Sequence, residues 1–174
     1  MMNVLDRRDQ ELVEKAQEAA ARAYAPYSLF AVGAAIRSKS EAIYSAANLE
    51  NASFGLTICA EAAALSLANS VGDPDIDAIA VVGFDFTRPA DASRVVSPCG
   101  SCRQLIAEAA QRANSNVRVI CCNGQLTTIV TSTITELLPN AFGPETLRVS
   151  RQWPELRQEL HAYVERLIAI RKGH

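Results

Sequence analysis

The chain has 174 residues, of which 49% are hydrophobic and 21% are charged. This length and balance favour one catalytic core of ordinary domain size and exclude a disordered or fibrous chain. Lys and Arg number 17 against 19 Asp and Glu, a net charge of −2, without the basic excess that nucleic acid binding normally requires. We therefore expect no nucleic acid polymer as a partner.

The first residues, MMNVLDRRDQELVEK, carry charges where a secretory peptide would need an apolar run, and no run of about 18 apolar residues predicts a membrane span. Five cysteines are an odd number, and Cys121 and Cys122 are adjacent in a run typical of a buried strand. This pattern favours reduced thiols over disulfides, so we expect a cytoplasmic protein with no membrane partner. The two histidines, His161 and His174, lie near the C-terminus, so chemistry elsewhere must use other groups.

Hydrophobic periodicity predicts these elements in chain order: a helix over 11–24 closed by Pro26, a hairpin of strands over 30–37 and 42–47, a helix over 58–72, a strand over 77–86, a helix over 99–113, and strands over 117–122 and 127–135. Strands interleaved with helices that cover both sheet faces predict an α/β fold, a three-layer α/β/α sandwich with a mixed five-stranded sheet. A last amphipathic helix over 153–170 lies beyond this core, and we expect it to serve packing or oligomerisation.

Two of the predicted helices begin on cysteines. Cys59 opens one helix, with Glu61 two residues later, and Cys99 and Cys102 open the next. In an α/β sheet, helix starts gather at the carboxyl ends of strands, and residues three apart share one face of a helical turn. The three thiols can therefore converge, and the positive ends of two helix dipoles favour their ionised form.

Three protein ligands with an open fourth position are typical of catalytic zinc, which lowers the pKa of a bound water to about 7. With Glu61 as proton carrier, this is the three-cysteine form of the zinc nucleobase deaminase signature. Cys99 and Cys102 alone also fit a dithiol redox pair, but Cys59 and Glu61 have no role in that alternative. Glu61 likewise speaks against a zinc-stabilised protein without catalysis.

Five runs resemble, in the same order, the small homotetrameric zinc-dependent cytidine deaminases, which are related to blasticidin-S deaminase: AYAPYSLFAVGAA, NLENASF, TICAEAAAL, PCGSCRQL and ELLPNAFGPETL. The resemblance implies a cytidine deaminase-like catalytic domain over residues 1–147 and a C-terminal helical extension over 148–174. It also implies hydrolytic deamination of a free pyrimidine nucleoside, cytidine or deoxycytidine, to uridine or deoxyuridine and ammonia, in pyrimidine salvage.

The resemblance also implies a role for each matching residue. Cys59, Cys99 and Cys102 would hold Zn²⁺, and Glu61 would be the catalytic proton shuttle. The expected substrate-binding groups are Asn48 and Glu50 at the ribose, Phe30 against the pyrimidine, and the backbone around Ala60 at its polar edge. Phe54 and Phe142 match aromatic residues that neighbouring subunits lend to each other's sites, which implies a homotetramer.

The chain departs from the family at Ala62, where an arginine that donates to the thiolates is common. The site then lacks a cation, and Arg103 and the two helix N-termini are the candidates to offset the negative charge. Ala62 also keeps open an alternative substrate, an N4-modified cytidine or a blasticidin-type aminoacyl nucleoside, whereas the NLEN run favours an ordinary ribose.

Overall fold

The structure of the protein, a computed structural model, describes residues 5–88, 93–144, 146–147 and 153–172. The chain divides into two units, Met1–Phe142 and Gly143–His174. All of the site residues predicted from the sequence belong to the first unit. Within the part of the chain that is described, no helix combines the length and apolar character needed to cross a membrane.

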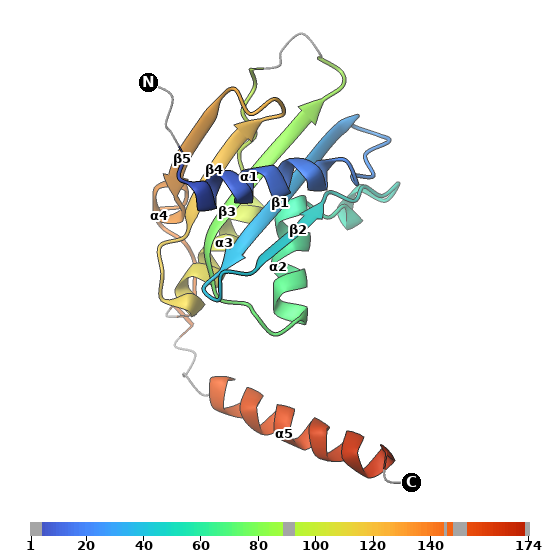
Figure 1. Cartoon of the computed structure of the whole chain (residues 1–174), viewed down its shortest axis with the longest axis vertical. Helices are drawn as coiled ribbons and strands as arrows, with labels where there is room; N and C mark the ends of the chain where they lie inside the picture. The colour runs from blue at the N-terminus through green and yellow to red at the C-terminus, as the bar shows by residue number, and fades with distance from the viewer. Residues whose placement is uncertain (1–4, 89–92, 145, 148–152, 173–174) are drawn as a thin grey trace. The chain divides into compact units, whose positions relative to one another are not determined.

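A sheet of five strands forms the centre of the first unit, in the order β2-β1-β3-β4-β5 (Figure 1). The strands are β1 (Phe30–Ser38), β2 (Ile43–Ala47), β3 (Ile76–Asp85), β4 (Arg118–Asn123) and β5 (Ile129–Thr133). β3 and β4 pair in parallel, whereas the other neighbouring pairs are antiparallel. The predicted mixed sheet is confirmed.

Helices cover both faces of this sheet (Figure 1). α1 (Arg7–Ala20) packs Leu12, Val13 and Ala16 onto one face, in a cluster with Ala35, Ala80 and Ile120. α2 (Ala60–Ser70) and α3 (Gly100–Ala113) cover the other face, where Ala64 and Ile106 pack with Ile36, Val81 and Val119. The predicted α/β/α sandwich is therefore confirmed.

The first helix is shifted toward the N-terminus relative to the prediction. It begins at Arg7 because the Asp6 side chain caps it, accepting a hydrogen bond from Asp9 N at 2.8 Å. It ends at Ala20, before the predicted end, and the chain becomes extended at Tyr24, whose backbone pairs with Leu49. Because α1 ends early, the segment before Phe30 can pair with the segment around Leu49.

The β-branched run over 127–135 is only partly a strand. β5 ends at Thr133, and the short helix α4 (Ile134–Leu137) follows directly. Thr133 and Glu136 form a capping box, in which Thr133 N donates to Glu136 Oε2 at 2.7 Å. Cap chemistry here overrides β propensity. A short 3₁₀ helix, η1 (Phe54–Leu56), also had no counterpart among the predicted elements.

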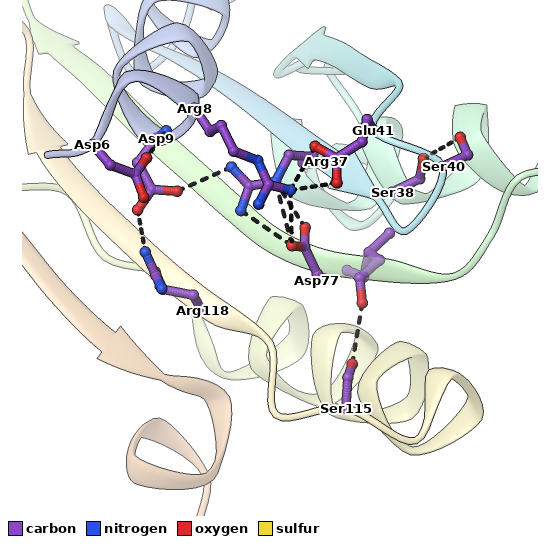
Figure 2. Close-up of polar contacts among 11 residues, drawn as sticks. Asp6, Arg8, Asp9, Arg37, Ser38, Ser40, Glu41, Asp77, Ser115 and Arg118 are labelled. Atoms are coloured by element: carbon purple, nitrogen blue, oxygen red, sulfur yellow. Dashed lines mark hydrogen bonds and ion pairs between the residues drawn. The ribbon is translucent and has the colours of Figure 1, made fainter.

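A cluster of charged side chains ties α1 to the sheet (Figure 2). Asp9 is only 2% exposed and accepts from Arg37 Nη1 at 3.0 Å and from Arg118. Arg37 also donates from Nε to Asp77 Oδ1 at 3.0 Å. Because two carboxylates face two guanidinium groups, the buried charges are compensated where they lie.

α1 approaches β1 closely at Gly33. A Cβ added there would lie 2.0 Å from the carbonyl oxygen of Ala16 and 2.4 Å from the nitrogen of Ala20. Both are backbone atoms, which cannot move aside without displacing the helix. The absent side chain of Gly33 therefore sets the distance between α1 and the sheet.

We expect Gly33→Ala to lower the free energy of unfolding by about 1–3 kcal/mol, because the added methyl group overpacks the contact between α1 and β1. Urea denaturation at a fixed protein concentration measures the effect. Gly55→Ala is the matched control, since a Cβ at Gly55 meets nothing within 4 Å. Equal stability of the two variants would contradict the close contact between α1 and β1.

The second unit contains α5 (Trp153–Lys172), a helix of 20 residues. Large apolar side chains along it are exposed, among them Trp153, Leu156, Leu160 and Tyr163. The predicted last helix is therefore present.

Candidate metal centre and active site

Two helices start at the same edge of the sheet. α2 ends at Ser70, shortly before β3 begins at Ile76, so its first turn lies at the carboxyl end of β3. α3 follows β3 and leads into the parallel strand β4, so it also starts at that edge. This arrangement brings together side chains from two motifs far apart in sequence.

The N-cap residues of these helices are Cys59 for α2 and Cys99 for α3. The Sγ atoms of Cys59, Cys99 and Cys102 all lie within 4.8 Å of one another, and the Cys59 and Cys99 sulfurs are 3.9 Å apart. Tetrahedral zinc with Zn–S bonds of about 2.3 Å separates two sulfurs by about 3.8 Å. Three thiols at this spacing fit a zinc ion.

The pKa of one thiol in this cluster, that of Cys59, is lowered, whereas the pKa values of the two core cysteines in β4 are raised. A hydrogen bond from Cys102 lowers the pKa of Cys59 to about 6, and the same pairing raises the pKa of Cys102. Burial raises the pKa of Cys121, and it raises that of Cys122 to about 12. Both of these are buried in β4, as expected for core cysteines, so they are poor candidates for ligands.

Glu61 lies in the first turn of α2 and is 4% exposed. Burial raises the pKa of its carboxyl group, while hydrogen bonds from its own backbone N–H and from Cys102 oppose that shift. A carboxyl group that is buried beside thiols and held at a helix start is suited to exchange protons.

Backbone hydrogen bonds place the polar residues of the NLEN run next to the segment that leads into Cys59. Leu49 and Ile58 exchange two N–H···O bonds of 2.9 Å, which sets residues 48–50 beside the segment that enters Cys59. Tyr24 N donates to the carbonyl oxygen of Asn48 at 3.1 Å, and Glu50 N donates to that of Tyr24 at 2.8 Å. Three sequence motifs thus meet at one edge.

The side-chain amide of Asn48 continues the ladder between β1 and β2. The last backbone pair of that ladder joins Gly33 to Ala47. Beyond it, Val32 N donates to Asn48 Oδ1 at 2.9 Å, and Asn48 Nδ2 donates to the carbonyl oxygen of Phe30 at 3.0 Å. The amide therefore acts as a substitute for a peptide group, and its orientation is fixed relative to Phe30.

Glu50 is fixed in a comparable way. Its Oε2 accepts from Tyr27 N at 2.9 Å and from Ser28 N at 3.3 Å. A hydrogen bond from the Ser28 side chain, supported by these two backbone donors, holds the pKa of the carboxyl group below its usual value. The same turn ends at Leu29, whose φ of 54° lies in the left-handed region. Phe30, partly buried, follows directly as the first residue of β1.

The remaining predicted residues take different positions. Ala60 is the fully buried first residue of α2, so its N–H is among those that a helix start leaves free of helical partners. Phe54 is 72% exposed and meets the Tyr27 ring edge-on at 5.6 Å between centroids. Phe142 is 55% exposed, and Gln104 Nε2 donates to its carbonyl oxygen at 2.6 Å.

Arg103, a candidate to offset the thiolate charge, is committed to the backbone. It donates from Nε to the carbonyl oxygen of Pro98 at 2.9 Å and from Nη1 to that of Leu137 at 3.2 Å. These bonds hold the residue before Cys99 in place. The guanidinium thus supports the position of a thiol, and the N-termini of α2 and α3 also favour negative charge at the thiols.

One residue near Phe30 was not singled out from the sequence. The Arg94 guanidinium lies over the Phe30 ring, 5.8 Å from its centroid, and pairs with Asp85 at 3.4 Å. A cation at this distance is attracted to the ring face. In the sequence, Arg94 is marked only by its position shortly before the PCGSC run. A single arginine in a loop does not by itself predict a functional role.

Known proteins share this fold and these motifs. Residues 6–121 match the family described as the cytidine and deoxycytidylate deaminase zinc-binding region. A cytidine deaminase from Halalkalibacterium halodurans is 45% identical over 138 residues, 79% of this chain and 96% of that protein. A blasticidin-S deaminase from Bacillus cereus is 40% identical over 136 residues, 78% of this chain and 92% of that protein.

A solved structure gives the same result in three dimensions. The crystal structure of a cytidine deaminase from Burkholderia pseudomallei superposes with a TM-score of 0.66 at 37% identity, covering 76% of this chain and 98% of the other. The fold and the matched zinc-binding region define a hydrolytic deaminase that uses zinc. The chain belongs to the cytidine deaminase family.

We expect Asn48→Asp to lower stability by about 1–3 kcal/mol at neutral pH, because a carboxylate cannot donate to the Phe30 carbonyl oxygen. Below the pKa of the new carboxyl group the deficit should shrink, since the protonated acid can donate again. Urea denaturation of both proteins at pH 7 and at acid pH measures the difference. A deficit that does not change with pH would contradict the role of Nδ2.

Proposed function

We propose that residues 1–147 form a catalytic domain that deaminates a free pyrimidine nucleoside, cytidine or deoxycytidine, in the cytoplasm. The observation that carries this proposal is the convergence of three thiols at two helix starts with Glu61 buried in the first turn of one of them. A relative also supports the proposal: a protein named cytidine deaminase is 45% identical to this chain over 96% of its own length.

Cys59, Cys99 and Cys102 would hold the zinc ion as thiolates. Two helix N-termini stabilise negative charge at this point, which offsets the surplus that three thiolates leave on a divalent ion. When bound, zinc acidifies a water molecule at its open position and so supplies the nucleophile for hydrolysis. Arg103 would act as a positioning residue through the Pro98 carbonyl oxygen.

Glu61 would carry the protons of the reaction. It takes a proton from the water and gives it to the ring nitrogen next to the amine-bearing carbon, while the water oxygen bonds to that carbon. It then moves the second water proton to the amine, the carbon–nitrogen bond breaks, and ammonia leaves. Burial that raises the pKa of Glu61 favours a carboxyl group that both accepts and returns a proton.

Asn48 and Glu50 would bind the ribose hydroxyl groups, with Phe30 against the pyrimidine and the Ala60 backbone at its polar edge. An amide has two N–H groups and two acceptor lone pairs, so Asn48 retains hydrogen-bonding capacity beyond its contacts with β1. The N–H groups of Tyr27 and Ser28 bind Oε2 of Glu50 and so fix the orientation of its carboxylate. Both groups would be preorganised by the fold.

We also propose a homotetramer in which Phe54 and Phe142 complete neighbouring sites. Apolar residues beside the site are exposed in this chain: Tyr24, Tyr27, Leu29, Leu49, Phe54, Leu56 and Ile58. A contiguous run of such residues along one edge is typical of a surface that another subunit covers. Sedimentation of the native chain measures the assembly.

Glu61→Gln should abolish deamination, with a loss of at least about 10²-fold, while bound zinc stays near one ion per chain. Ammonia release and metal analysis on the same sample test this. Cys99→Ala is the counterpart, which should lose zinc as well as activity. Full activity in the Glu61 variant would refute the proton role, and unchanged zinc in the Cys99 variant would remove that ligand.

A second candidate substrate is an N4-modified cytidine or a blasticidin-type aminoacyl nucleoside. Two observations favour it: Ala62 in place of the usual arginine, and a relative named blasticidin-S deaminase at 40% identity. Ammonia release from cytidine, deoxycytidine, N4-methylcytidine, cytosine and blasticidin S separates the candidates. We expect cytidine and deoxycytidine to react fastest; a preference for either rival substrate would replace the first proposal.

A further inference from the structure

α5 carries an apolar stripe with heptad spacing. Its members are Trp153, Leu156, Leu160, Tyr163, Leu167 and Ile170, which alternate at intervals of three and four residues. All but Leu167, which is partly buried, are between 49% and 60% exposed. Spacing of this kind aligns side chains along one seam, as the a and d positions of a coiled coil do. The helix is about 30 Å long, enough for nearly three heptads.

The residues next to the seam carry an asymmetric set of charges. Glu159 and Arg166 lie on one side, in the positions named g in a coiled coil, and Arg157, Val164 and Arg171 lie on the other side. The Arg166 guanidinium is 6.0 Å from the centre of the Tyr163 ring, which holds it against the edge of the stripe. Glu165, by contrast, lies on the outer face, close to His161 at 3.6 Å.

We propose that α5 pairs with α5 of a second copy of this chain in antiparallel orientation. Antiparallel pairing stacks Trp153 on Ile170, Leu156 on Leu167 and Leu160 on Tyr163 of the other helix, so the whole stripe is covered. The g positions then face each other, and Glu159 of each helix meets Arg166 of the other. Two opposite-charge pairs flank one seam.

A parallel pair of the same helices is disfavoured by charge. There a g position faces the e position of the following heptad, so Arg166 would meet Arg171 of the other helix on both sides and Glu159 would meet Val164. Two repulsive pairs would replace two attractive pairs. Charges beside the seam set the orientation of helix pairs, which is why the antiparallel arrangement fits this sequence.

The test uses the full chain, in which Trp153 is the sole tryptophan and its emission reports on the seam. Glu159→Arg and Arg166→Glu should each shift the emission to longer wavelength and expose Trp153 to acrylamide, since each weakens pairing about tenfold. Co-expression of the two variants should restore the native emission, because each chain then faces one of opposite charge. Glu165→Arg makes the same charge change on the outer face and should have no effect.

Identical emission from the native chain and both seam variants would overturn the proposal. Loss in each variant without rescue on co-expression would also overturn it, because it would place α5 against another part of its own chain. A second measurement uses Arg166→Lys in a mixture of ¹⁵N-labelled and unlabelled chains. A carbodiimide should then link the Glu159 carboxylate of one chain to the introduced amine at position 166 of the other, joining labelled to unlabelled chains. Absence of this mixed cross-link would exclude the antiparallel pair.

Discussion

The three thiols of the metal centre come from two helices whose first turns lie side by side, and this convergence depends on the order of elements around β3. α2 precedes β3 and runs in the opposite direction to it, whereas α3 follows β3 and leads to the parallel strand β4. Both helices must therefore begin at the carboxyl edge of the sheet. Because Cys59 and Cys99 are the N-cap residues, the positions of the two helix starts are enough to bring their sulfurs together.

α1 covers the face of the sheet opposite to α2 and α3. There α1 is fixed by the buried Asp9–Arg37 pair and by the close approach at Gly33. These contacts hold β1, the strand that begins with Phe30 and whose neighbour β2 ends before Asn48. The packing of α1 on one face thus holds the strand whose first residue, Phe30, is hydrogen-bonded to Asn48.

Sequence reasoning located the mixed sheet, its helices and the cysteine pattern, because these depend on local periodicity and on motifs a few residues long. It did not place the ends of α1 or of β5, because Asp6 and the Thr133–Glu136 capping box outweigh hydrophobic spacing there. The bond of Asn48 to the Phe30 carbonyl oxygen, that of Arg103 to the Leu137 carbonyl oxygen, and the place of Arg94 over Phe30 were equally hidden. Each depends on a partner far along the chain that only the folded backbone brings near.

Asn48 holds the start of β1 in place and is also a proposed ribose-binding residue, which limits the substitutions that position 48 can accept during evolution. Its amide extends the β1–β2 ladder, so a substitution at this residue that changed the proposed ribose contact would also break hydrogen bonds at the start of β1. Substitution at position 48 is therefore constrained by folding, in addition to any constraint from the proposed ribose role. New substrate preferences would have to arise at neighbours without such duties, such as Ala62, whose methyl group carries no hydrogen bond of the fold.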